Sequence, residues 1–454
     1  MTRILNTKQL ALYLVALLSV LAACKKEDGT AFSQSPDDRV NATLAKYQSL
    51  LSGAANGWKA VVTPTGGGAY SFYMKFNDAN RVVMYSDFDS STAVAPRESS
   101  YRLKSLQQPS LIFDTYSYLH LLADPNENTI NIQSNVNGLR GGTLGQGLQS
   151  DFEFAIDTAT ADSIRLTGRQ HGTKALLVKA TQQEAAAYTS GQVLQPMLQL
   201  RNLNKILYYF KRFTLGAKAY DVTINDNLKT ITFTWIGSGG TIQTFSTNYY
   251  YTVNGIAFVT PFNDGSQTIT GFTGINWSDA TNSFSLTANG TTGTIAGVNS
   301  PIAVDKEAPI RWYNTAIAAG STYWISLNGF HANGVDDAFN IKSLKNDTWS
   351  YFYLIYWPQF GSNYDLFAPV FINPTQDTID LFYGTAPRAP SITTDGRAVF
   401  RELGTLGPYP TSGPAALSRT QLYNAGGYYF VQTSATSYDM VSAADAKTWI
   451  TWEL

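Results

Sequence analysis

Tyr70-Ser71-Phe72-Tyr73-Met74-Lys75-Phe76 is a segment in which apolar side chains occupy every second position. This period of two is typical of a β-strand with one buried face. The polar run Asn77–Asn80 follows, and the apolar-rich segment Arg81–Tyr85 comes after it. Two strand-like segments joined by a short polar turn predict a β-hairpin. This hairpin indicates a β-rich fold, and its neighbours extend the pattern.

Further strand-like segments lie on both sides of the hairpin. They are Trp58–Val62, Ser99–Lys104, Ser110–His120 and two segments near Ile164 and Leu176, which the loop Gly168–Gly172 separates. Strands at this short spacing predict an antiparallel meander that closes as a barrel or sandwich. Ahead of the meander, apolar residues recur at steps of three and four from Val40 to Leu51, which predicts a helix over Asp37–Leu51.

The strand pattern changes twice along the rest of the chain. Short helical segments near Glu184–Tyr188 and Leu198–Tyr208 interrupt it, and strands then resume. The predicted strands are Ala219–Ile224, Thr230–Trp235, Tyr249–Val253, Ile256–Thr260 and Ser283–Thr287. The second change lies at Pro301, after which most of the tryptophans occur.

The predicted fold is therefore mainly β. It consists of two or three antiparallel units of the sandwich or barrel type, with an N-terminal helix and a short helical interlude. The expected units are 37–180, 181–300 and 301–454. Tyr101–Leu103 ahead of Pro109–Asp114 resembles Tyr250–Val253 ahead of Gly255–Phe258. Two copies of one β unit explain this similarity, and so does generic β patterning.

The first residues have the order of a secretory signal peptide. Arg3 and Lys8 precede an apolar run, and small residues end it at Leu21-Ala22-Ala23-Cys24. This ending resembles the lipobox of bacterial lipoproteins, in which the cysteine is lipidated and the segment before it is removed. We therefore expect a signal peptide over 1–23, a lipidated Cys24 and a tether over 24–36. The alternative is a cleaved signal beside a coincidental free thiol.

The expected location is the outer membrane, with the protein anchored by lipid and facing the cell exterior. The charged segment Lys25–Gly29 resembles the surface-export signal of Bacteroidetes lipoproteins, although a solvated tether has the same composition. Without the signal peptide, 30 basic residues face 33 acidic ones, so the mature net charge is −3. This balance gives no electrostatic basis for binding nucleic acid. The single cysteine excludes a disulfide within the chain.

The sequence offers little for catalysis. The three histidines, His120, His171 and His331, form no closely spaced ligand pair, so neither a metal site nor another cofactor is expected. The Gly-x-Ser-x-Gly motif of a hydrolase is absent from the sequence. On one strand, Asp114 and His120 would share a face, with Asp124 nearby. The acids nominated for glycoside hydrolysis are Glu98, Asp336 and Asp337, but exposed acids of this kind are common.

Aromatic residues crowd one stretch of the last third, from Trp349 to Phe367. Sugar rings stack on tryptophan and tyrosine faces, while nearby amides and carboxylates bond the hydroxyls. The candidate ligand-binding residues are Trp349, Trp357, Tyr364 and Asp365, with Asn363 beside them. By strand alternation, Tyr351, Tyr353 and Ile355 share one face and Phe352, Leu354 and Tyr356 the other. The alternative interpretation is that all these aromatics form a β core.

Several motifs of the first part resemble a Bacteroidetes lipoprotein family whose domain has no known function (family 4302). They are Asn56–Lys59, Gly68–Tyr73, Ser99–Arg102, Leu111–His120 and Gly168–Gly172. The similarity is densest over 37–179 and extends more loosely to about residue 299. The resemblance implies an exported, anchored envelope protein and brings no activity or catalytic residue with it. By association, the resemblance also implies a place beside outer-membrane nutrient-uptake machinery.

The predicted function is that of a surface-exposed, non-catalytic lipoprotein that binds a glycan or peptide for nutrient acquisition. The expected partners are the membrane, through Cys24, the glycan or peptide ligand and an outer-membrane uptake complex. Two alternatives stay open at this point. One is a hydrolase with an unrecognised carboxylate pair, and the other is a structural partner of an outer-membrane complex.

Overall fold

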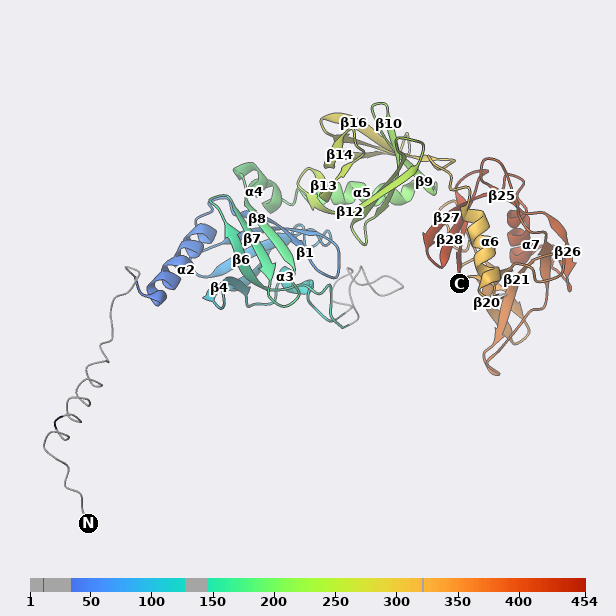
Figure 1. Cartoon of the computed structure of the whole chain (residues 1–454), viewed down its shortest axis with the longest axis horizontal. Coiled ribbons are helices and arrows are strands. Elements are labelled where there is room, and N and C mark those ends of the chain that lie inside the picture. The colour runs from blue at the N-terminus through green and yellow to red at the C-terminus, as the bar shows by residue number, and fades with distance from the viewer. Residues whose placement is uncertain (1–10, 12–33, 127–144, 321) are drawn as a thin grey trace, which may run out of the picture.

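The computed structural model describes residues 11, 34–126, 145–320 and 322–454 (Figure 1). Apart from residue 11, the predicted signal peptide therefore lies outside the described residues, as do Cys24 and most of the tether. The strands form three sheets that follow one another along the chain. The first two are closed antiparallel barrels of eight strands each, and the third is a curled sheet. The predicted mainly β class is confirmed.

The first barrel is a meander closed by pairing of its first and last strands. Its strands are β1 (Trp58–Thr63), β2 (Tyr70–Phe76), β3 (Arg81–Ser86), β4 (Arg97–Ser105), β5 (Pro109–Phe113), β6 (Glu153–Ala159), β7 (Ser163–Gly168) and β8 (Lys174–Lys179). The predicted hairpin is β2–β3, in which Phe72 pairs with Ser86. Inward-pointing residues such as Phe72 and Tyr101 are almost fully buried, so side chains fill the barrel.

The predicted N-terminal helix is α2 (Pro36–Ser52). The side chain of Ser35 caps it by accepting a hydrogen bond from the Asp38 amide at 3.1 Å. The helix is joined to the barrel because Trp58 donates through Nε1 to the Leu51 carbonyl at 3.0 Å.

One predicted strand is too long. The segment Ser110–His120 leaves the sheet at Phe113, and Tyr118–Leu121 forms the short helix α3. Asp114 forms an ion pair with Arg102 across β4 at 2.7 Å, and the chain then turns. The prediction that Asp114 and His120 share one strand face is therefore wrong.

The helical interlude consists of α4 (Gln182–Thr189), α5 (Leu194–Leu200) and η1 (Arg201–Lys205). Helix α4 begins with a capping box: the Glu184 amide donates to Thr181 Oγ1, and the Thr181 amide donates to the Glu184 carboxylate. Glu184 also pairs with Lys59 of β1 at 2.5 Å. Helix α5 packs on the second barrel, where Gln199 accepts a hydrogen bond from the Trp277 amide.

The second barrel repeats the topology of the first. Its strands are β9 (Phe210–Leu215), β10 (Lys218–Asn225), β11 (Thr230–Ile236), β12 (Ile242–Thr252), β13 (Gly255–Asn263), β14 (Thr268–Ser278), β15 (Ser283–Ala288) and β16 (Thr291–Val298). Strand β16 closes on β9. The similar tyrosine segments lie in β4 and β12, each the fourth strand of its barrel, and the segments after them lie in the fifth strands. This equivalence favours two copies of one β unit.

The third sheet surrounds a tryptophan-rich core. Its strands are β17 (Trp324–Ser326), β18 (Phe330–Ala332), β19 (Lys345–Asn346), β20 (Trp349–Trp357), β21 (Leu366–Asn373), β22 (Thr378–Asp380), β23 (Gly384–Pro387), β24 (Ser391–Ile392), β25 (Ala398–Val399), β26 (Glu402–Leu406), β27 (Tyr428–Ser434), β28 (Ser437–Ser442) and β29 (Thr448–Glu453). The helical elements are α6 (Ala308–Ala318), η2 (Ile341–Ser343) and α7 (Gly413–Leu422). Trp312 of α6 stacks on Trp324, and both are fully buried.

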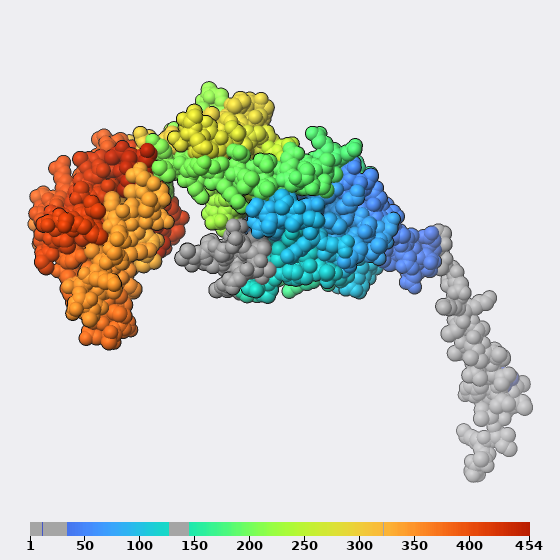
Figure 2. Space-filling model, turned by 180° about the vertical axis from the view of Figure 1, so that it is seen from behind, coloured from blue at the N-terminus to red at the C-terminus, as the bar shows by residue number. Residues whose placement is uncertain are grey.

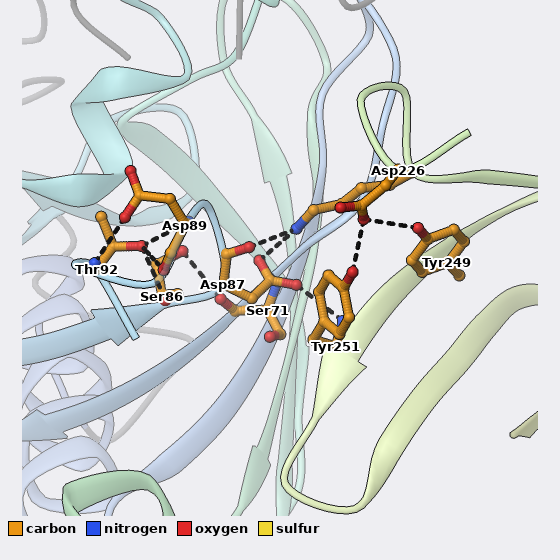
Figure 3. Close-up of polar contacts among 9 residues, drawn as sticks. Ser71, Ser86, Asp87, Asp89, Thr92, Asp226, Tyr249 and Tyr251 are labelled. Atoms are coloured by element: carbon orange, nitrogen blue, oxygen red, sulfur yellow. Dashed lines mark hydrogen bonds and ion pairs between the residues drawn. The ribbon is translucent and has the colours of Figure 1, made fainter. Parts of the chain in front are cut away.

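A buried polar network joins the two barrels (Figure 3). Asp87 follows β3, and its carboxylate accepts hydrogen bonds from the amides of Ser71 in the first barrel and Tyr251 in the second. Lys229 of the second barrel lies 2.8 Å from the same carboxylate, and the side chains of this ion pair are 2% and 0% exposed. The carboxylate of Asp226 accepts hydrogen bonds from the hydroxyls of Tyr249 and Tyr251. This network fixes the first barrel against the second.

The second barrel meets the third sheet through a smaller apolar cluster around Phe210, Val441 and Ala446. Tyr209 strengthens this contact by donating to the Asp439 carboxylate at 2.7 Å. The three units form an arc in which the third unit lies at the end opposite α2 (Figures 1 and 2). Among the described residues, the helices are all too short or too polar to cross a bilayer.

Candidate ligand-binding site

Strand β20 carries both predicted tryptophans, one at each end. Its nine residues place the Cα atoms of Trp349 and Trp357 about 26 Å apart. Trp349 packs edge-on against Phe382, with 5.5 Å between the ring centroids. Trp357 lies at the other end, beside the loop that carries Tyr364 and Asp365. The structure thus brings three of the four predicted residues together and separates Trp349 from them.

Six aromatic rings contact one another in succession from the outer face of β20 into the loop that follows. In order, they are Phe352, Tyr353, Tyr323, Trp357, Phe360 and Tyr364, and we call them the aromatic row. Successive ring centroids lie 4.6, 6.3, 5.1, 5.2 and 6.2 Å apart. Phe352 and Phe360 are 42% and 40% exposed. Tyr323, Trp357 and Tyr364 are half-buried, and Tyr353 is buried at 7% exposure, so the row presents ring surface to solvent at its two ends and in part between them.

A β-bulge decides which residues of β20 point outward. The register with β21 shifts between Tyr351 and Tyr353. Tyr351 therefore packs against the core on the inner side, where its hydroxyl donates to the Ser326 carbonyl at 3.1 Å. Tyr353 and Ile355 stay on the outer side. The prediction that Tyr351 shares a face with Tyr353 and Ile355 is wrong because simple alternation contains no bulge.

The loop between β20 and β21 lines a pocket of about 670 Å³. Phe360 and Tyr364 supply its aromatic surface, and Gln359, Ser362 and Asn363 supply polar groups. The side chains of these three polar residues are exposed and make no hydrogen bond to other described residues. Their donors and acceptors are therefore available to a ligand that rests on the rings.

Asp365 is buried below this loop and does not face solvent. It is 1% exposed, and its carboxylate accepts hydrogen bonds from the hydroxyls of Tyr356 and Tyr313 at 2.6 and 2.9 Å and from the Gln359 amide at 2.7 Å. Burial raises the pKa of this carboxyl above its ordinary value. Because its oxygens are engaged in this way, Asp365 holds the loop in place beneath the aromatic row.

Tyr364 is positioned by the glycine three residues before it. A Cβ atom on Gly361 would lie 2.3 Å from Cε1 of Tyr364, so only glycine lets the ring lie against the backbone here. The Gly361 amide also donates to the Tyr364 carbonyl at 2.9 Å. Sequence reasoning found Tyr364 but missed Tyr313 and Tyr323. Tyr313 lies in α6 and Tyr323 just before β17, and nothing in the sequence around either residue indicates its contact with the site.

The residues nominated for a triad do not form one. His120 stacks on Phe152, its Nδ1 accepts a hydrogen bond from the Ser117 amide, and its Nε2 lies 3.2 Å from the Phe113 carbonyl. Burial lowers the pKa of this imidazole. Asp114 is paired with Arg102, and Asp124 accepts a hydrogen bond from Tyr116. Each side chain therefore has a separate structural contact.

The other nominated acids are also engaged. Glu98 pairs with Arg81 at 2.6 Å. Asp337 accepts hydrogen bonds from the amides of Ile341 and Lys342 at the start of η2. Asp336 lies 2.6 Å from His331 Nδ1. Within the described residues, no group of three or more metal-binding side chains comes together.

The motifs that carry the family resemblance shape the first barrel. In the Gly168–Gly172 loop, the amides of Gln170, His171 and Thr173 donate to the Asp151 carboxylate at 2.7 to 3.1 Å. A Cβ atom on Gly168 would lie 2.0 Å from that carboxylate. The loop thus depends on glycine and on Asp151, and its residues serve folding of the barrel.

Comparison with known proteins gives a family match that covers the first barrel and most of the second. None of the curated proteins matches the sequence. A family model described as a domain of unknown function (DUF4302) matches residues 28–277, which is more than half of the chain. The match ends within β14, so the third unit with the aromatic row lies beyond it. The chain belongs to the DUF4302 family.

Proposed function

We propose that this protein is a cell-envelope lipoprotein, anchored through Cys24, that binds a glycan on the aromatic row during nutrient acquisition. The observation that carries the proposal is the row itself: six adjoining rings beside a pocket in which the side chains of Gln359, Ser362 and Asn363 have no partner among the described residues. The anchoring rests on the lipobox-like sequence Leu21–Cys24, and the outward orientation on the charged residues after it.

The arrangement matches the chemistry of a sugar chain. The faces of a sugar ring carry C–H groups that pack on aromatic rings, while its edges carry hydroxyls. The row provides rings that contact one another in succession, and Gln359, Ser362 and Asn363 provide amide and hydroxyl groups at one end. A chain of several sugars could lie along the row while its end enters the pocket.

The overall shape supports a binding role at a distance from the membrane. Helix α2 comes directly after the predicted tether, and the third unit lies at the opposite end of the arc (Figure 1). The buried pair Lys229–Asp87 holds the two barrels together between these ends. In this arrangement the barrels act as a spacer that presents the aromatic row away from the anchor.

A glycan array tests this proposal. The soluble form beginning after Asp28 would be compared with Trp357→Ala and with the control Trp349→Ala, which changes the tryptophan at the far end of the same strand. We expect saturable binding to one class of polysaccharide, weakened about tenfold or more in Trp357→Ala and unchanged in Trp349→Ala. Absence of binding to plant, host and microbial glycans would refute the proposal.

A further inference from the structure

A second groove runs along the junction between the second barrel and the third sheet. It consists of two hollows of about 460 and 500 Å³ that share Tyr209, Lys211, Val222 and Thr223. A smaller hollow of about 180 Å³ continues from the second one and shares its residues His331, Asp336 and Trp449. We call these connected hollows the junction groove. It lies on different elements from the aromatic row.

Lys211 lies where the two larger hollows meet. It belongs to β9, and its ammonium group donates to the Tyr208 carbonyl at 3.0 Å. Within the parts of the chain that the structure describes, no carboxylate pairs with this ammonium. The neighbouring cations differ: Arg212 pairs with Asp221 and Arg311 pairs with Asp305, both at 2.6 Å. Lys211 is thus the cation of the groove that lacks an anion.

An unpaired ammonium group in a half-buried position is unfavourable. Burial lowers the pKa of Lys211 to about 8, so the group still carries its charge at neutral pH. Removing a charge from water costs free energy unless an opposite charge compensates. A ligand carboxylate in the groove would supply that charge, and both hollows give it access to Lys211.

The walls of the groove have the composition of a sugar site. On one side, Trp449 stacks on His331 with 3.7 Å between the ring centroids, and Tyr209 packs edge-on against Trp449. On the other side, hydroxyl and amide groups line the hollow beside the carboxylates of Asp221 and Asp305, which are paired with Arg212 and Arg311. The hydroxyl and amide groups belong to Thr223, Thr232, Thr234, Thr244 and Gln432. Rings and hydroxyls together suit a carbohydrate better than an apolar ligand.

We infer that the junction groove is a second glycan site, which takes a sugar bearing a carboxylate, such as a uronic acid. Its carboxylate pairs with the Lys211 ammonium, its ring lies against the Trp449 side of the groove, and its hydroxyls bond to the threonine-lined wall. The inference stands apart from the proposed function because no residue of the aromatic row lines the groove.

Calorimetric titration of the soluble chain with an oligogalacturonate and with its fully methyl-esterified form tests the inference. The ester removes the negative charge and keeps the sugar backbone. We expect the acid to bind. The affinity for the ester should be lower by at least about tenfold. Lys211→Met should remove the preference for the acid. The control is Lys218→Met, which changes an exposed lysine in the adjacent strand β10. This variant should keep the preference for the acid.

The inference would be overturned by no binding of the acid, by equal binding of acid and ester, or by an unchanged preference in Lys211→Met. Equal binding of a polyglutamate peptide would also overturn it, by assigning the groove to acidic chains in general. If Lys211→Met fails to fold, the comparison of acid and ester in the unaltered chain still decides. Trp357→Ala should retain acid binding, which separates this test from that of the aromatic row.

Discussion

The two junctions of the molecule each contain a lysine on the second barrel, and the two lysines have opposite surroundings. Lys229 at the first junction is 2% exposed and lies 2.8 Å from the fully buried carboxylate of Asp87 (Figure 3). Lys211 at the second junction borders two hollows, and no carboxylate of the described residues pairs with it. The ion pair of the first junction is buried, whereas the second junction is open because it contains the hollows of the junction groove.

This difference shows how one chain can combine a fixed base with a binding region. At the first junction, the charge of Lys229 is neutralised within the protein, so its contribution is to stability. At the second junction, the charge of Lys211 is left for a ligand. The aromatic row lies in the third unit, which also forms part of the wall of the open junction. We therefore expect substitutions at the first junction to lower the free energy of unfolding. Substitutions at the second junction and in the aromatic row should instead affect ligand binding.

The largest effect is expected at the first junction. Lys229→Met leaves the Asp87 carboxylate buried without its cation, so the free energy of unfolding should fall by about 3–5 kcal/mol. Urea unfolding followed by circular dichroism measures it. The double variant Asp87→Asn with Lys229→Met removes both charges and should lose less than the single one. A loss below about 1 kcal/mol in Lys229→Met would show that the pair does not fix the barrels.

Lys211 should affect how the free energy of unfolding depends on pH. The unfolded chain holds this proton up to about pH 10.5, while the folded chain releases it at about 8. Between these values the unfolded state binds more protons, so the free energy of unfolding should rise with pH, on the order of 1–3 kcal/mol relative to Lys211→Met. The other titratable groups that border these hollows are present in both the unaltered protein and Lys211→Met, so their titration contributes to both curves. They include Tyr209, Asp221, His331 and Asp336. Parallel curves for the two proteins would contradict the placement of Lys211.

A smaller effect, confined to binding, is expected in the third unit. In Gly361→Ala, the new Cβ displaces the Tyr364 ring from the end of the aromatic row. Glycan affinity should fall about threefold to tenfold, and the free energy of unfolding should change by less than about 1 kcal/mol. Gly404→Ala is the matched control, since nothing lies within 4 Å of a Cβ there. Equal affinities of the two variants would argue against a role for Tyr364.

The smallest effect on the free energy of unfolding is expected from the loss of an exposed ion pair, which serves as the reference for Lys229→Met. Lys205 pairs with Asp279 at 2.8 Å, but the two side chains are 51% and 76% exposed. Lys205→Met should therefore change the free energy of unfolding by less than about 1 kcal/mol. The same urea experiment measures it. A loss as large as that of Lys229→Met would mean that burial does not distinguish the two ion pairs.

Local sequence patterns predicted the elements of this fold well. Period-two alternation located β2, and apolar spacing located α2. The pattern failed where one residue changes the course of the chain. Examples are the end of β5 at Phe113 and the bulge at Tyr351–Tyr353.

The candidate site was predictable only in part. The crowding of aromatics pointed to Trp357 at the end of β20 and to Tyr364 in the loop after it, and Phe360 connects their rings. Trp349 is close to them in sequence but lies at the far end of an extended strand. Tyr323 joins the row from another element, and the isolation of Lys211 depends on where every carboxylate lies in space. Neither property belongs to a local stretch of sequence.

The most direct test of glycan binding by the aromatic row is hydrogen–deuterium exchange, with and without an oligosaccharide of the class that the array selects. It locates the ligand on the unaltered protein. We expect slower exchange in the loop Pro358–Tyr364 and at the end of β20, with the first barrel unchanged. Protection confined to the barrels, with the Pro358–Tyr364 loop unaffected, would contradict the account.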